Sequence, residues 1–113
     1  MAGVTISTHV LDIERGRPAS GVPVALARRA GDGWTSVGEG ITNADGRIAA
    51  LAPAPQPAGT YRLEFDVAAY LQARDGAAPY LQRVCLEVVL DADQHYHIPL
   101  LLSRYASTSY RGS

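Results

Sequence analysis

Three histidines, one arginine and the C-terminal residues are the side chains of this chain that could carry chemistry. Imidazole has an ordinary pKa of about 6.5, so it can take up and release protons near neutral pH. His95 and His97 are separated by one residue, and His9 lies near the other end of the sequence. Arg47 directly follows residues 43–46, whose composition predicts a turn. These groups suit proton transfer and the binding of a planar polar molecule.

The C-terminal tail is a second candidate. Tyr110, Arg111, Gly112 and Ser113 offer a phenol, a guanidinium, a flexible glycine and a hydroxyl beside the terminal carboxylate. The ends of most domains are loose and have no such concentration of functional groups. We therefore expect this tail to have a task.

The histidines fall on predicted strands, on the faces that point away from the core. Side chains alternate between the two faces of a strand, so residues 95–102 place an apolar row on one face and both His95 and His97 on the other. Residues 4–12 alternate in the same way and place His9 on the more polar face. A tight turn and a last strand, over residues 105–112, follow.

The rest of the sequence predicts a β-sandwich. Turn-forming residues separate further strands, expected at residues 22–27, 34–42, 47–48, 61–65 and 81–90. The only helical signal covers residues 67–74, which we expect Asp66 to cap and Gly76 to end. About eight strands with one short helix predict an all-β sandwich. We expect residues 1–113 to form a single domain.

Composition argues against several classes of partner. The formal net charge is −1 and no basic stripe is present, so neither nucleic acid nor an anionic membrane is an expected partner. No segment approaches the roughly 18 apolar residues of a membrane span, and no export signal precedes the first strand. Cys85 is the only cysteine, which we interpret as an inert, at least half-buried thiol. A reducing compartment, the cytoplasm, fits this composition.

Other interpretations of the candidate residues remain open. The histidines could be solvated or interface side chains, and Arg47 could be a salt-bridge partner at the end of a turn. His95 and His97 share a face and could bind zinc together with His9. No acidic or cysteine ligand is spaced to complete such a site, so we predict no metal. Phosphate-binding loops, nucleophile elbows and paired carboxylates are not found in the sequence.

Four segments carry a resemblance to a known family. They are ISTHVLD at residues 6–12, TNADGR at 42–47, HYHIPLLLS at 95–103 and YRGS at 110–113. They resemble the 5-hydroxyisourate hydrolase family, transthyretin-related enzymes of urate degradation, and the resemblance runs over the whole chain. The final tetrapeptide distinguishes these hydrolases from transthyretin, the hormone carrier. Two departures are Arg104, where a proline is usual, and residues 106–109, where a tyrosine-bearing stretch is common.

The resemblance implies a fold, an activity and a set of site residues. It implies a transthyretin-like sandwich that hydrolyses 5-hydroxyisourate to 2-oxo-4-hydroxy-4-carboxy-5-ureidoimidazoline without a metal or an organic cofactor. The catalytic residues it implies are His9, Arg47, His97 and Ser113, with Tyr110, Arg111 and Gly112 binding substrate. It also implies a homotetramer with sites between dimers, which would give groups on an outer sheet face the concave surroundings of a ligand site. The alternative is a non-catalytic, transthyretin-like carrier of small molecules.

Overall fold

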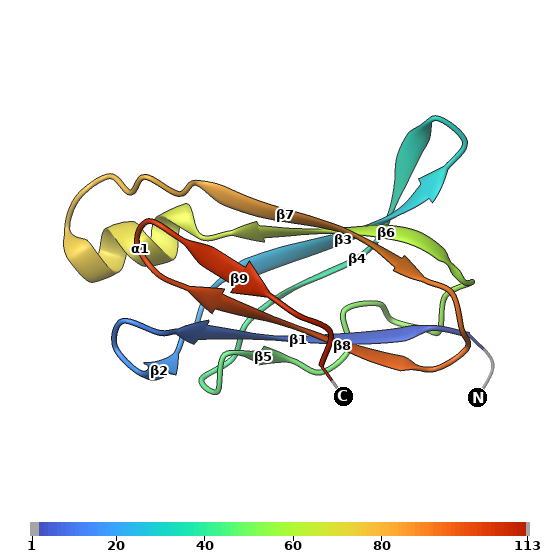
Figure 1. Cartoon of the computed structure of the whole chain (residues 1–113), viewed down its shortest axis with the longest axis horizontal. Coiled ribbons are helices and arrows are strands. Elements are labelled where there is room, and N and C mark those ends of the chain that lie inside the picture. The colour runs from blue at the N-terminus through green and yellow to red at the C-terminus, as the bar shows by residue number, and fades with distance from the viewer. Residues whose placement is uncertain (1–2, 113) are drawn as a thin grey trace.

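Two β-sheets face each other in the computed structural model, which describes residues 3–112 (Figure 1). The first, called here the histidine sheet, has the order β2-β1-β8-β9, with β5 also paired to β1. Its strands are β1 (Thr5–Asp12), β2 (Arg17–Pro18), β5 (Arg47–Ile48), β8 (His95–Leu102) and β9 (Ser107–Ser109). The second sheet has the order β4-β3-β6-β7. Its strands are β3 (Pro23–Ala30), β4 (Gly33–Ile41), β6 (Gly59–Asp66) and β7 (Arg83–Leu90).

The predicted all-β sandwich is confirmed. Residues 3–112 contain nine strands instead of about eight, because the turn-rich connection after β1 folds back and pairs Arg17 and Pro18 with the end of that strand. The predicted last strand is shorter than expected, since only Ser107–Ser109 forms a ladder with β8. A tight turn joins β8 to β9, where the Ser103 N–H donates to the Ala106 carbonyl at 2.9 Å.

The core forms where the alternating apolar rows of both sheets meet. Burial alternates strictly along β1, so that Ile6 and Val10 are enclosed while Ser7 and His9 are only partly covered. The same alternation applies to the second sheet, from which Leu63 and Phe65 are fully enclosed. Each such side chain contributes roughly 1.5–3 kcal/mol by leaving water. Burial of these rows leaves the intervening side chains of each strand on the outer faces.

The helix α1 (Ala68–Asp75) joins β6 to β7, but Asp66 does not cap it. The capping position is taken by Val67, which makes no side-chain capping hydrogen bond, and Asp66 is the last residue of β6, opposite Arg83. Gly76 ends the helix as predicted, with φ 72° and its N–H donated to the Gln72 carbonyl. Within residues 3–112, no helix is long and apolar enough to cross a membrane.

The expectation of an at least half-buried Cys85 is wrong, because the thiol is exposed. β7 is the edge strand of the second sheet, and Cys85 lies on its outward row, next to Glu64 of β6. The preceding and following residues of β7 point toward the core and are more covered.

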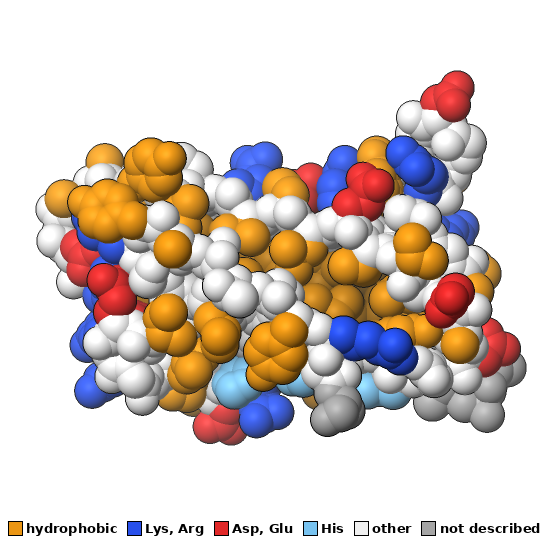
Figure 2. Space-filling view, in the orientation of Figure 1, with side chains coloured by type: hydrophobic (Ala, Val, Ile, Leu, Met, Phe, Trp, Pro, Cys, Tyr) orange, Lys and Arg blue, Asp and Glu red, His pale blue; other side chains and the backbone are white. Residues whose placement is uncertain are grey.

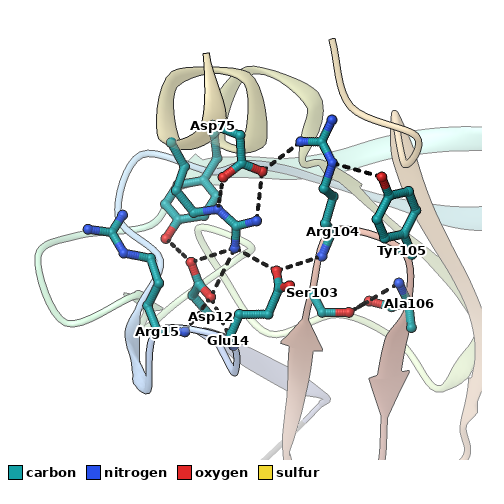
Figure 3. Close-up of polar contacts among 10 residues, drawn as sticks. Asp12, Glu14, Arg15, Asp75, Ser103, Arg104, Tyr105 and Ala106 are labelled. Carbon is teal, nitrogen blue, oxygen red and sulfur yellow. Dashed lines mark hydrogen bonds and ion pairs between the residues drawn. The ribbon is translucent and has the colours of Figure 1, made fainter. Parts of the chain in front are cut away.

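A buried carboxylate connects the end of β1 to the helix (Figure 3). Asp12 is fully enclosed and accepts hydrogen bonds from the backbone N–H groups of Glu14 and Arg15, at 3.1 Å each. The Tyr70 hydroxyl donates to it at 2.7 Å, and the Arg74 guanidinium lies 3.2 Å away. Asp12 therefore has hydrogen-bond donors on several sides, as a buried charge requires.

The hydrogen bonds of Asp12 decide its ionisation. Burial alone would raise the pKa of the Asp12 carboxyl, but hydrogen bonds from Tyr70, Arg15 and Arg74 outweigh this effect and lower the pKa below its ordinary value. Burial and the bond to this carboxylate together raise the pKa of Tyr70 to about 12. Asp12 is thus an anion, and Tyr70 a neutral donor, at neutral pH.

Replacing Asp12 by asparagine should lower the free energy of unfolding by about 2 kcal/mol, because the buried site would lose its charge-assisted hydrogen bonds, although Arg74 keeps its ion pairs with Glu14 and Asp75. Since the pKa of Asp12 is lower in the folded state, its stabilising effect is full above about pH 4 and is lost as pH falls further. Urea unfolding of Asp12→Asn should therefore show a smaller loss of stability in acid than the wild type shows. Asp32→Asn, in the exposed turn between β3 and β4, is the matched control. If Asp12→Asn and Asp32→Asn lost the same free energy of unfolding on acidification, this role of Asp12 would be contradicted.

Candidate active site

His97 points outward from the histidine sheet and is held by a hydroxyl of the neighbouring strand. β1 and β8 pair in parallel with Ser7 opposite His97, and the Ser7 Oγ lies 2.8 Å from His97 Nδ1. The same Oγ lies 2.8 Å from His95 Nε2, and the other ring nitrogen of His95 lies 2.7 Å from the Thr5 Oγ1. The predicted outward placement of both histidines is confirmed, and His97 Nε2 is the ring nitrogen left for chemistry.

His9 lies between His97 and Arg47. In the parallel pairing His9 is opposite Pro99, two residues from His97, which brings the ring centroids of the two histidines to 6.5 Å. On its other side, His9 is opposite Arg47 of β5. Three side chains from three strands therefore meet on one outer face of the sheet.

The turn before β5 fixes the position of Arg47. The Asn43 side-chain oxygen accepts hydrogen bonds from the N–H groups of Asp45 and Arg47, at 2.9 and 3.0 Å. Gly46 has φ 74°, and a Cβ at this position would lie 2.5 Å from the Val10 carbonyl oxygen, so only glycine fits this approach to β1. The turn predicted for residues 43–46 is confirmed, and it places Arg47 beside His9.

A groove of about 340 Å³ lies over these residues. Its lining includes Ser7, Asn43, Arg47, Ile48, His95 and His97. Figure 2 shows histidine side chains together along the lower edge of the view, where Figure 1 places β1, β5 and β8. The Arg47 guanidinium makes no hydrogen bond or ion pair with any residue from 3 to 112, so it is free to bind a ligand.

Gly112 brings the C-terminal tail against His97. Its N–H donates to the His97 carbonyl at 2.8 Å, in an isolated antiparallel bridge. A Cβ on Gly112 would lie 2.8 Å from the His97 ring carbon Cδ2 and 2.9 Å from the His97 carbonyl oxygen. Only a residue without a side chain allows this contact. Ser113, which follows, lies outside the described residues.

Tyr110 and Arg111 lie away from the histidines. The Arg111 guanidinium lies over the Tyr96 ring, 5.0 Å from its centroid, and Tyr96 belongs to the buried face of β8. Both tail residues border a separate hollow between β7 and the end of the histidine sheet, and Tyr110 is 58% exposed. Within residues 3–112, the structure brings together His9, Arg47, His97 and Gly112.

The environment of His97 favours its neutral form. Burial is the largest cause that lowers the pKa of His97 below its ordinary value, followed by the positive charge of Arg47 and then by His9 and His95. A neutral imidazole with an open Nε2 can accept a proton at neutral pH. The groove thus combines the His97 base, the His95 imidazole and the Arg47 cation.

Comparison with known proteins identifies the family of this chain. Residues 6–112 match the model of the HIUase/Transthyretin family. The chain belongs to this family. It is 43% identical to the 5-hydroxyisourate hydrolase of Deinococcus radiodurans, over 96% of this chain and 95% of the relative.

Two solved structures of the family resemble this chain closely. The 5-hydroxyisourate hydrolase of Klebsiella pneumoniae is 40% identical, with a TM-score of 0.84 over the full length of both chains. Sea bream transthyretin, solved in complex with thyroxine, is 34% identical, with a TM-score of 0.80 over 95% of this chain and 93% of that chain. The transthyretin-like fold expected from the sequence is confirmed.

The structure adds Ser7 and Asn43 to the site, and it gives the zinc alternative no support. Ser7 was not recognised as a candidate, although it alternates with His9 on the outward face of β1. Both ring nitrogens of His95 are engaged by hydroxyls, which leaves no lone pair directed at a shared metal. No group of three His, Cys, Asp or Glu side chains within the described part of the chain is placed to bind a metal ion.

Replacing Arg47 by glutamine should raise the pKa of His97 toward the ordinary value for histidine, because a nearby positive charge that disfavours the imidazolium is removed. Burial and the other histidines remain, so the return should be incomplete. Titration of the imidazole resonances by NMR measures this directly. Arg83→Gln, on the second sheet, is the control with the same change of charge. An unchanged His97 titration in Arg47→Gln would show that the two groups do not interact.

Proposed function

We propose that this chain is an enzyme that hydrolyses 5-hydroxyisourate in urate degradation. Family membership and the named activity of the relatives support the reaction. The observation that carries the proposal to the residues is the meeting of His9, Arg47 and His97 on one outward face. A single domain over residues 1–113 and a cytoplasmic location belong to the same proposal.

The proposed reaction is attack of water on a ring carbonyl, followed by opening of the adjacent cyclic amide C–N bond. The product is 2-oxo-4-hydroxy-4-carboxy-5-ureidoimidazoline. Such a hydrolysis needs a base for the water proton and a donor for the oxyanion. His9 and His97 supply the proton-handling and water-orienting pair, and the lowered pKa of His97 keeps it neutral and ready to accept a proton. No metal or organic cofactor takes part.

Arg47 is proposed to bind the substrate and stabilise charge in the transition state. A guanidinium presents a fork of donors that matches a planar ring with several acceptors. The Asn43 turn fixes the Arg47 backbone beside His9, and the guanidinium makes no hydrogen bond or ion pair with another residue from 3 to 112, so it can turn toward a substrate. The pairing of His9 with Arg47 supports the proposal that the imidazole and the guanidinium act on the same ligand.

The tail completes the proposed site. Ser113 is assigned to the water site through its hydroxyl, and Tyr110, Arg111 and Gly112 are assigned to substrate binding. Gly112 has the strongest support, because it contacts His97. Arg111 has the weakest, because its guanidinium lies over Tyr96 and borders another hollow.

A homotetramer with sites between dimers is part of the proposal. The groove lies on an outer sheet face and is open on one side, whereas ligand sites are concave and enclose most of their ligand. A second copy of the histidine sheet placed over the groove would supply the missing wall. The same assembly would exclude water from the reacting groups.

A non-catalytic carrier is the rival function, favoured by the similarity to sea bream transthyretin. A carrier needs a complementary channel but no proton-active groups. His95, His97 and the Arg47 guanidinium line one groove, and His9 lies beside His97, so the arrangement favours the enzyme.

Freshly prepared 5-hydroxyisourate should lose its ultraviolet absorbance much faster with the wild-type protein than in buffer. His97→Ala should lower the catalysed rate by roughly 100-fold to 10,000-fold, as expected for loss of a general acid–base group. Asp32→Ala, in the exposed turn between β3 and β4, is the control and should keep wild-type turnover. A wild-type protein that leaves the spontaneous rate unchanged would indicate the carrier instead. Full activity of His97→Ala would show that His97 does not take part in catalysis.

Gly112→Ala should lower turnover by about 100-fold, because its Cβ would push the tail and the His97 ring apart. Circular dichroism should still report the wild-type fold, since the change affects the groove and leaves the core intact. Gly59→Ala is the matched control, because a Cβ at that position meets no atom within 4 Å. Wild-type turnover in Gly112→Ala would show that the contact with His97 is not required.

A further inference from the structure

A continuous chain of hydrogen bonds runs along the histidine sheet and ends at His97. Thr5 Oγ1 lies 2.7 Å from His95 Nδ1, His95 Nε2 lies 2.8 Å from Ser7 Oγ, and Ser7 Oγ lies 2.8 Å from His97 Nδ1. The parallel register produces this chain, since Thr5 is opposite His95 and Ser7 is opposite His97. Each link is as short as a good hydrogen bond between a hydroxyl and a ring nitrogen.

The Ser7 hydroxyl gives this chain a direction. A hydroxyl has one proton, so Ser7 can donate to only one of its two imidazole partners and must accept from the other. In one arrangement His97 Nδ1 donates to Ser7 and Ser7 donates to His95, which leaves His97 Nε2 as a base. In the other, His95 donates to Ser7 and Ser7 donates to His97, which makes His97 Nε2–H an acid.

The two imidazoles differ in how well they tolerate a positive charge. His97 is partly buried, and the groups that face it are His9 of β1, Arg47 of β5 and His95 of β8. His95 is more exposed than His97 in this chain, and its second ring nitrogen lies 2.7 Å from the Thr5 hydroxyl, whose oxygen can accept a hydrogen bond from an imidazolium. A charge that forms on His97 during catalysis is therefore stabilised when it moves to His95.

We propose that Ser7 and His95 are positioning residues that relay a proton to and from His97 during hydrolysis. This inference rests on the proposed function of the groove and adds two residues to its machinery. It also assigns His97 as the histidine of the pair that handles the proton, and leaves His9 to orient the water.

Each proton that moves to or from Ser7 returns to its starting position by the end of one turnover. Water gives a proton to His97 Nε2 as its oxygen bonds to the substrate carbonyl carbon. The His97 Nδ1 proton passes to Ser7 Oγ while the Ser7 proton passes to His95 Nε2, so that His95 holds the positive charge and His97 is neutral. When the C–N bond breaks, His97 Nε2–H protonates the departing nitrogen. The two Ser7 transfers then run in reverse and restore the starting state.

Ser7→Ala breaks the relay at its middle, and Ser7→Thr keeps the hydroxyl. We expect Ser7→Ala to lower kcat by about 10-fold to 100-fold, less than the loss at His97 itself, with KM nearly unchanged. Ser7→Thr should recover most of the lost kcat. In mixtures of light and heavy water, kcat of the wild type should fall along a curve, because several protons move together, and kcat of Ser7→Ala along a straight line. Ser36→Ala, on β4 of the second sheet, is the control.

Two results would overturn the relay. One is a Ser7→Ala variant with wild-type kcat and a curved heavy-water dependence. The other is a loss of kcat in Ser7→Ala that Ser7→Thr does not recover at all, which would indicate packing instead of proton transfer. His95→Gln should reproduce the straight line of Ser7→Ala, because an amide cannot take the charge, and an unchanged curve would count against the relay.

Failure of the proposed function can be told apart from failure of the relay. A wild-type protein that does not accelerate decay of 5-hydroxyisourate would overturn the function. The hydrogen-bonded chain is then judged by imidazole ¹⁵N chemical shifts, which report the protonation of each ring nitrogen. We expect Ser7→Ala to change the shifts of His95 Nε2 and His97 Nδ1. Unchanged shifts at both nitrogens would overturn the chain itself.

Discussion

The parallel pairing of β1 with β8 is the constraint that builds both the core and the groove. Eight consecutive residue pairs, from Thr5 and His95 to Asp12 and Leu102, join the two ends of the chain. Because side chains alternate, this register sends one row into the sandwich and the other to the surface. A slip of one residue would turn His97 into the core and bury its charge-bearing ring among apolar side chains. Packing of the core therefore enforces the arrangement of the outer face.

Polar contacts connect the C-terminal end of β1 to the turn that precedes β9. Asp12 and Arg74 connect β1 to the helix, and Arg104 extends this connection to the turn before β9 (Figure 3). The Arg104 N–H donates to Glu14 at 2.9 Å, and its guanidinium lies 2.6 Å from Asp75. A proline, usual at this place in the family that the sequence resembles, has no N–H to donate. This chain thus fixes the turn through polar contacts that a proline could not make.

Alternation along the strands was enough to predict where the histidines point and that the fold is a sandwich. Pairing between distant strands could not be predicted, and so Ser7 was overlooked as the partner of His97. Local patterns also failed where tertiary contacts decide: Asp66 stays in β6 instead of capping the helix, and Cys85 lies on the open side of an edge strand. The Arg111 guanidinium packs on the Tyr96 ring of β8, and no local sequence pattern specifies this contact.

Enzymes and carriers of this family share one sandwich, so the fold alone does not decide between them. The outer face of the histidine sheet does. An apolar ligand would take water away from the Arg47 guanidinium and the imidazoles without replacing their hydrogen bonds, which is costly for each polar group. A planar substrate rich in carbonyl and N–H groups replaces those bonds, and the imidazoles can then act on it. The polar chain from Thr5 to His97 would have no use in a carrier, whereas it gives a hydrolase a place to hold a proton between bond formation and bond cleavage.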